Sequence, residues 1–493
     1  MSTSHFDPEL GSSRRASLDS FDSASEHSSL DSTTALVLIH DPDEAVEESP
    51  FDVSGDEEEE DDLGGAAAPA LPPATVFLYL LSPYLKLGAL LVPSHTLPLD
   101  WAVPTLVGFA VLSAFTRQVW FMLARYVRKA EMEDVVCDAF ARGGGKEGRR
   151  RVIRALVRLA TGVTRGLLAV VYLRASVDML IPLTSPSFGL RRVGLTAALG
   201  VVTFPLAWAK SLAFRRVVYS TWLSVGAYVV WMGLETYAQV RGADTVDPSP
   251  RMGSLWQGIT TIAFAFSTTT TLPLYASLKG TPRSITTASK HSLSFTLLSL
   301  LSVAVATGVM LPLVIAASSS NLQASDFPST YVMAILKVVV LVSSIPALVI
   351  TSPAVPMPLG MRRVSDVPFS KIIALLMVGL LSLVPEKAAY VMEDVLLVLM
   401  LLNALASPAL VHIVTYQFKR PLSIVMPHTP ALHRHRSSDS AFSHDELLQR
   451  KERTLQRRRL WRRVAWDVGV WVVLLPISGG GFTWAGGRIL GAW

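Results

Sequence analysis

Long apolar stretches separated by short polar segments dominate the chain from Thr75 onward. Most are near the 20 or so residues that an α-helix needs to cross the hydrocarbon core of a bilayer. The pattern predicts an all-α polytopic membrane protein with eleven spans, over residues 75–97, 102–126, 152–180, 192–210, 216–239, 254–278, 292–317, 328–353, 369–385, 389–416 and 462–484.

The polar segments divide the chain into four parts. Residues 1–72 are rich in Ser, Asp, Glu and Gly, so we expect a disordered cytosolic tail that cannot bury enough apolar surface to fold. Residues 73–418 form the predicted ten-helix core. A basic loop, 419–461, precedes the eleventh helix and C-terminus, 462–493.

The loops between the spans carry an uneven charge. Those after the second, fourth, sixth, eighth and tenth spans contain lysine and arginine, whereas 94–101 and 318–328 contain neither. Because positively charged loops stay in the cytosol, this alternation predicts a cytosolic N-terminus and a C-terminus on the opposite side. The Arg/Lys-rich part of 421–460 is a candidate for a helix on anionic membrane lipids, with an ordinary positive-inside loop as the alternative.

Composition narrows the function further. Half of the 493 residues are hydrophobic and 17% are charged, which is typical of a membrane protein. The single Cys137 excludes a disulfide within the chain and a cysteine-based metal site. The spans show no metal-ligand spacing and no phosphate-binding glycine loop, so we expect no enzyme, no metal and no cofactor. The basic clusters come without a nucleic-acid motif, so we expect no nucleic-acid partner.

Three serines in the polar segments are candidates for phosphorylation. Ser17 follows Arg14–Arg15, Ser54 precedes a run of acidic residues, and Ser437 lies in the basic loop. Matches by chance in solvated segments are the alternative. Phosphates in these segments would alter their charge and their partners.

The sixth span is poorly suited to a continuous helix. Ser267 is followed by four threonines, 268–271, whose branched side chains disfavour helix, and Pro273 lacks an N–H group. Freed backbone groups at membrane depth are tolerated only where they are buried in protein or line a watery cavity. A break in this span therefore predicts a binding site.

The first span offers a partner for that break. It contains Gly88 and Pro93, which weaken a helix, although an ordinary kink is the alternative for either span alone. Interrupted spans at corresponding positions of two halves mark the site of a transporter, and spans one and six correspond if spans 1–5 and 6–10 are repeats.

Broken helices suit a zwitterionic amino acid. One helix end exposes N–H groups for the carboxylate, and the other exposes carbonyls for the ammonium group or a cation. The hydroxyls of Ser267 and Thr268 could cap the broken ends. The predicted substrate-binding residues are Gly88, Ala89, Leu90, Phe264, Ala265, Phe266, Ser267 and Thr268.

Several motifs together resemble the amino acid/auxin permease family, within the wider amino acid–polyamine–organocation superfamily. The resemblance covers roughly residues 75–490 and is most specific in the sixth span. The matching motifs, in chain order, are Gly88–Pro93, Tyr172 with Asp178, Phe204–Leu206 with Ser220, Ala263–Phe266 with Pro273 and Tyr275, Val384–Pro385, and Asn403 with Pro408.

The resemblance implies a fold, an activity and a location. The fold would be the LeuT-type 5+5 inverted repeat plus an eleventh transmembrane helix. The activity would be secondary transport of amino acids. We further expect alternating access coupled to protons, with sodium as the alternative ion, in a monomer. The long acidic tail is similar to that of fungal vacuolar members, so the vacuole or another endomembrane is expected, with the plasma membrane as the alternative.

Lys86 stands where this family has the first glycine of its motif. A lysine in the middle of a span has a high free-energy cost, and its presence therefore indicates a function. Its ammonium group could replace a bound sodium ion, or it could block the site so that the protein does not transport. Alternatively, the span is shifted and Lys86 reaches the interface.

Other polar residues in the spans are candidates for ion coupling. Ser343 and Ser344 resemble hydroxyls that ligate a cation in this fold, although such residues also join helices. Asp178 lies four residues after Arg174, so an ion pair is the main alternative to a proton relay. Arg158 and Arg165 share one helix face, and Lys337 has no obvious partner.

A different class of function also fits the sequence. The chain could be an amino acid sensor or signalling protein of the same fold that no longer transports. An ion channel fits poorly, because no acidic ring or selectivity-filter motif is present.

Overall fold

The structure is a computed structural model in which every regular element of the described residues is a helix. It describes residues 71–94, 97–127, 129, 131–141, 147–184, 191–209, 211–241, 252–267, 274, 288–319, 329–353, 369–418 and 464–489. Ser17, Ser54, Thr268 and Ser437 lie outside these residues, as do nearly all of the tail and the whole 419–461 loop.

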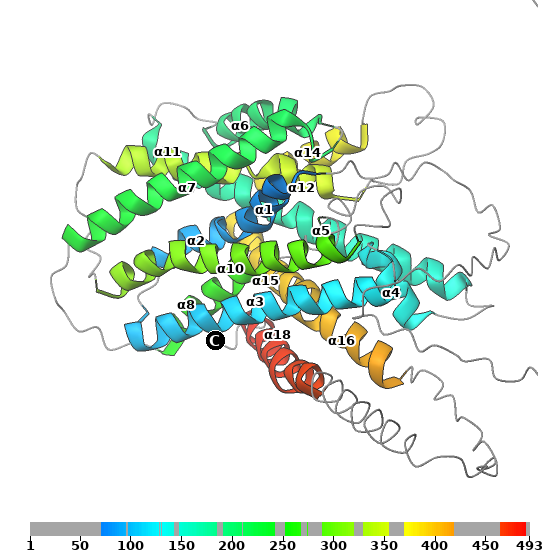
Figure 1. Cartoon of the computed structure of the whole chain (residues 1–493). Helices are drawn as coiled ribbons and strands as arrows, with labels where there is room; N and C mark the ends of the chain where they lie inside the picture. Colours follow the sequence, from blue (N-terminus) through cyan, green and yellow to red (C-terminus); the bar gives the residue numbers. More distant parts are fainter. Residues whose placement is uncertain are drawn as a thin grey trace, which may run out of the picture. The chain divides into compact units, whose positions relative to one another are not determined.

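The helices follow the predicted spans in chain order (Figure 1). Their bounds are α1 Pro73–Leu81, α2 Leu87–Leu91, α3 Leu99–Val127, α4 Met132–Phe140, α5 Glu147–Leu180, α6 Arg191–Ala207, α7 Arg215–Arg241, α8 Met252–Phe266, α10 Ala288–Ser319, α11 Ser329–Val342, α12 Ile345–Thr351, α14 Phe369–Ser382, α15 Glu386–Leu401, α16 Ser407–Ile413 and α18 Leu475–Ile489. Prolines stand in the first turns of α1, α12 and α16, where a missing N–H group costs no helical hydrogen bond.

Seven helical segments of the described chain are long and apolar enough to cross a membrane. They are Leu99–Val127, Glu147–Leu183, Arg215–Arg241, Phe295–Ala317, Tyr331–Thr351, Glu386–Tyr416 and Val464–Arg488. The first predicted span is a bent pair that passes the same test, and Leu255–Phe266 and Phe369–Ser382 are shorter apolar helices. The chain is therefore a helical polytopic membrane protein by length and composition of its helices, while α6, with 17 residues, falls below that test.

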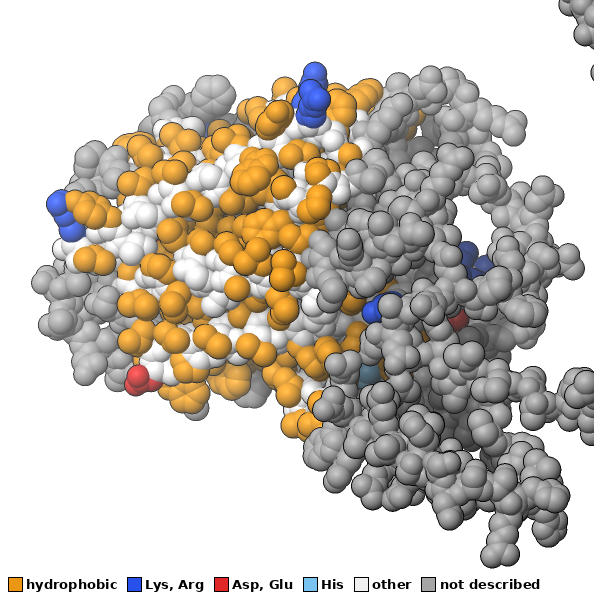
Figure 2. All heavy atoms as spheres, in the orientation of Figure 1, with side chains coloured by type: hydrophobic (Ala, Val, Ile, Leu, Met, Phe, Trp, Pro, Cys, Tyr) orange, Lys and Arg blue, Asp and Glu red, His pale blue; other side chains and the backbone are white. Residues whose placement is uncertain are grey.

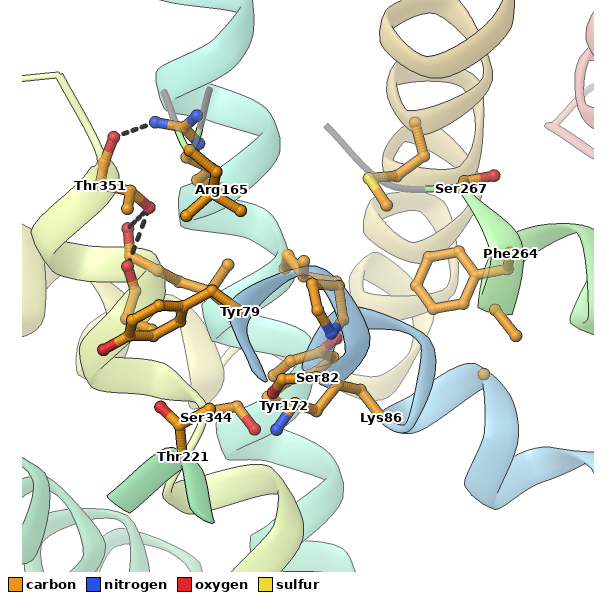
Figure 3. A pocket seen from close by; sticks show the side chains of 18 of the residues that line it. Tyr79, Ser82, Lys86, Arg165, Tyr172, Thr221, Phe264, Ser267, Ser344 and Thr351 are labelled. Carbon is orange, nitrogen blue, oxygen red and sulfur yellow. Dashed lines mark hydrogen bonds between the residues drawn. The ribbon is translucent and has the colours of Figure 1, made fainter. Parts of the chain in front are cut away.

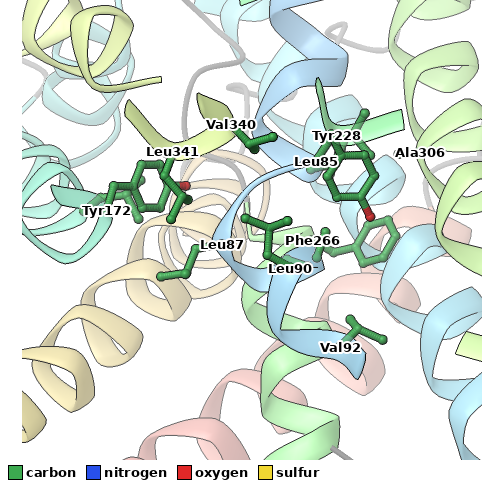
Figure 4. Close-up of a cluster of buried hydrophobic side chains, with 14 of the residues drawn as sticks. Leu85, Leu87, Leu90, Val92, Tyr172, Tyr228, Phe266, Ala306, Val340 and Leu341 are labelled. Atoms are coloured by element: carbon green, nitrogen blue, oxygen red, sulfur yellow. The ribbon is translucent and has the colours of Figure 1, made fainter. Parts of the chain in front are cut away.

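Apolar side chains cover both the inside and the outside of the helical bundle. The largest buried cluster joins α1, α2, α5, α7, α8, α10 and α11, and Figure 4 shows part of it around Leu90 and Phe266. Large apolar residues such as Val111, Val201 and Leu297 are exposed, and Figure 2 shows hydrophobic side chains spread across the described face. Such a surface suits contact with lipid rather than water.

The last helical segment is joined to the preceding one by two polar contacts. At one end, His412 Nε2 lies 3.0 Å from Asp467 Oδ1; at the other, Arg488 pairs with Asp394 at 3.2 Å. A Cβ atom on Gly481 would lie 2.5 Å from Leu401 Cδ1, so glycine permits this close approach. α15 thus packs against α18, while α16 contacts the part of the last segment around Asp467.

Candidate functional site

The first span breaks just before Gly88. α1 ends at Leu81 and continues as a 3₁₀ turn to Tyr84, and α2 begins at Leu87 after a bend of 40°. Lys86 is not helical, with φ −121° and ψ −149°. The break therefore lies at Leu85–Lys86, whereas the sequence predicted a weakened helix at Gly88 and Pro93.

Gly88 brings the first and sixth spans into backbone contact. A Cβ atom at this position would lie 2.6 Å from the Cα atom of Ala265 in α8. No real side chain atom tolerates such a distance, so only glycine allows α2 and α8 to approach this closely. The structure thus places the two predicted interrupted spans against each other.

α8 ends where the run of hydroxyl residues begins. Its last residue is Phe266, and the Ser267 hydroxyl donates a hydrogen bond of 2.7 Å to the Ala263 carbonyl. The residues that would continue this span, 268–273, lie outside the described part of the chain. The described residues are consistent with a break, because the helix stops at the expected point.

A cavity lies beside the two helix ends (Figure 3). The space between its walls and across its open mouth amounts to about 950 Å³. Spans one, three, five, six and eight supply most of its walls. Its lining includes Tyr79, Ser82, Lys86, Gly88, Arg165, Tyr172, Thr221, Phe264, Ala265, Ser267, Ser344 and Thr351.

The predicted site residues divide between this cavity and its surroundings. Six of them line it: Lys86, Gly88, Phe264, Ala265, Ser267 and Ser344. Four others are buried next to it in the helices without forming its lining: Ala89, Leu90, Phe266 and Ser343. Phe266 packs against Tyr84, with ring centroids 5.3 Å apart.

Asp178 lies outside this cavity. Its carboxylate is 2.9 Å from Arg192 and 3.8 Å from Arg174, and about half of its side chain is exposed. The expected pair with Arg174 is therefore present. These contacts favour a structural ion pair over the predicted role in ion coupling.

Lys86 is buried in a network of hydroxyls and a carbonyl. Its amino group donates to the Ser224 hydroxyl of α7, which in turn donates to the Val340 carbonyl at 3.0 Å. The Ser344 hydroxyl donates to the same carbonyl at 2.5 Å. Lys86 is 5% exposed and therefore shares one buried network with the predicted cation-ligating serine.

Ser343 and Ser344 lie at a second break, between α11 and α12. Their backbone forms a turn before Pro346, and the Ser220 hydroxyl of α7 donates to the Ser343 carbonyl at 2.9 Å. Side chains from α7 thus satisfy carbonyls that this break would leave without partners. The network around Lys86 joins the breaks of the first and eighth spans.

Two buried arginines near the cavity were not predicted as part of the site. Arg165 lines the cavity and donates to the Thr351 carbonyl at the end of α12. Arg117 donates at 2.9 Å to the Leu80 carbonyl, just before the first break, and lies over the Tyr84 ring. Only their position in the middle of apolar spans could have indicated them from the sequence.

Lys337, which had no obvious partner in the sequence, has two in the structure. It lies 4.0 Å from a carboxylate oxygen of Glu235 and 5.2 Å from the centre of the Trp231 ring, both on α7. It is not part of the cavity lining.

No protein-family model matches this chain, and no curated protein matches it.

Proposed function

We propose that this protein is a secondary active transporter of amino acids with a LeuT-type 5+5 inverted repeat and an eleventh transmembrane helix, similar to the amino acid/auxin permeases. The observation that carries the proposal is the cavity beside the contact of Gly88 with Ala265. This cavity combines a broken first span, the end of α8 and the break at Ser343–Ser344. Interrupted helices around a central site are typical of secondary transporters.

The substrate would lie between the first and sixth spans. The first N–H groups of α2 have no acceptor within that helix, and the Ser267 hydroxyl lies on the α8 side of the cavity. The Phe264 side chain supplies an apolar wall (Figure 3). Alternating access would move the helices around this site.

Lys86 would take the place of a coupling cation. Its amino group is bound to Ser224, within the network that includes Ser344. A lysine ammonium group here would make a bound sodium ion unnecessary, so we propose proton coupling. We place the protein in a vacuolar or other internal membrane with its N-terminus in the cytosol, on the basis of tail composition and loop charge.

Reconstitution tests this function. The full chain in liposomes should accumulate labelled amino acids when a pH gradient is imposed, and a protonophore should abolish the accumulation. Empty liposomes provide the control. Saturable binding of an amino acid without any flux would overturn transport and support the alternative, an amino acid sensor in which Lys86 blocks the site.

A further inference from the structure

The cavity contains two cationic side chains and no carboxylate among its described lining residues. Lys86 enters from the break of the first span, and Arg165 enters from the middle of α5 (Figure 3). Within the described chain, neither forms an ion pair with an acidic residue. A charge inside a membrane span is expensive and is usually paired, so this imbalance requires an explanation.

Arg165 has one hydrogen bond that fixes its position and further N–H donors that can bind a ligand. Its Nη1 atom donates to the Thr351 carbonyl, whereas its Nε atom is buried and has no hydrogen-bond partner in the described part of the structure. The residue is 9% exposed. A guanidinium group has five N–H donors, so this one can bind a further acceptor while it keeps its contact with Thr351.

Neighbouring arginines show how the chain neutralises this charge elsewhere. Arg158, two turns earlier in α5, binds Glu133 at 2.6 Å, and Arg154 binds Asp134 at 3.2 Å. Glu133 is therefore already engaged by another arginine. Arg165 differs because it faces a cavity rather than α4.

We propose that the cavity binds an acidic amino acid, aspartate or glutamate, whose side-chain carboxylate accepts hydrogen bonds from Arg165. This inference rests on the proposed function and specifies its substrate. Guanidinium groups bind carboxylates strongly because their planar donors match the two oxygens. Lys86 contributes a second positive charge, which favours a solute with a net negative charge.

Binding of glutamate and glutamine to the full chain in nanodiscs tests this inference. The two ligands have nearly the same size and shape but differ by one charge. Wild type should bind labelled glutamate at least about tenfold more tightly, the factor expected for a hydrogen bond to a charged group. Arg165→Gln should lose about tenfold in glutamate affinity without a change for glutamine, and Arg165→Lys should keep a preference for glutamate.

Arg174→Gln is a matched control. Arg174 lies on the same helix, is 6% exposed and donates to the Val384 carbonyl at 2.7 Å, but it does not line the cavity. It should retain the glutamate preference. An equal loss of glutamate affinity in this variant, or equal loss of both ligands in Arg165→Gln, would overturn the inference. Size-exclusion profiles identify variants that fail to fold, in which case Arg165→Lys decides.

Wild-type behaviour separates this inference from the proposed function. Equal affinity for glutamine and glutamate, or flux of neutral amino acids alone, would overturn the acidic substrate and leave transport intact. Competition by glutarate as strong as that by glutamate would overturn the assignment to amino acids, because glutarate lacks the amino group. Absence of flux for every amino acid would overturn the proposed function itself.

Discussion

The cavity and the contact between the segments Glu386–Tyr416 and Val464–Arg488 treat charged side chains in opposite ways. At the helix contact, Arg488 meets Asp394, and His412 meets Asp467. At the cavity, Lys86 and Arg165 meet hydroxyls and carbonyls instead. Opposite charges join two helices, whereas cations that line a cavity and have no acidic partner among the described residues are available to a ligand. Paired charges therefore hold the bundle together, and cations that line the cavity can act on a solute.

The largest expected effect is at the contact between the first and sixth spans. Gly88→Ala should destabilise the protein by roughly 1–3 kcal/mol, since its methyl group would overlap the Ala265 backbone, and should abolish uptake. Thermal unfolding and uptake in liposomes measure the two effects. Gly226→Ala on α7 is the control, because no atom outside its own stretch of helix lies within 4 Å of its Cβ position. Wild-type uptake by Gly88→Ala would contradict a mechanism that depends on this contact.

The next effect concerns the cation at the cavity. Lys86→Gly should lose proton-driven accumulation by about tenfold, a typical size for coupling between two sites. Uptake with and without a pH gradient, and with and without sodium, measures this change. If uptake and ion dependence are both unchanged, Lys86 has no role in coupling.

A smaller effect is expected at the helix contact. Asp394→Asn should lower stability by roughly 1–3 kcal/mol, because it leaves the Arg488 guanidinium without its charged acceptor. The double variant Asp394→Asn/Arg488→Gln should recover part of the loss. Thermal unfolding of the single and double variants tests this, and substrate affinity should stay at the wild-type value. A loss of affinity without a loss of stability would erase the distinction between the two regions.

The smallest effect is a pH dependence outside the spans. Burial raises the pKa of the Glu133 carboxyl above its ordinary 4.5, against the lowering effect of Arg158. The folded chain therefore retains this proton better than the unfolded chain does. The resulting stability is present below pH 4.5 and is lost as the pH rises through the folded pKa. Glu133→Gln should flatten this part of the stability profile by a few tenths of a kcal/mol, roughly the scale of partly exposed charges.

The sequence predicted the positions of the helices and the contact between the first and sixth spans. Apolar length predicted a helix in each span, and the poor helix formers after Phe266 indicated where α8 would end. For the first span, Gly88 and Pro93 predicted a break later in the chain than the observed one, because glycine and proline report only local backbone preferences. The observed break has a long-range component, since Arg117 of α3 supplies the donor for the Leu80 carbonyl.

The charged residues show the same limit. Arg158 and Arg165 share a helix face in sequence, yet one binds α4 and the other lines the cavity. Helical periodicity gives the direction of a side chain around its own helix, but not which neighbour that direction faces. Lys337 likewise had partners that only the packing of α7 against α11 provides.

The contact at Gly88 also has a mechanical consequence. Elsewhere in a bundle, flexible side chains separate neighbouring helices and can absorb a small displacement by changing rotamer. At Gly88, no side chain separates α2 from α8, because the backbone of α2 contacts the backbone at Ala265. A displacement of either helix toward the other must displace the second helix as well. α2 and α8 would therefore move together as one rigid unit that forms one wall of the cavity.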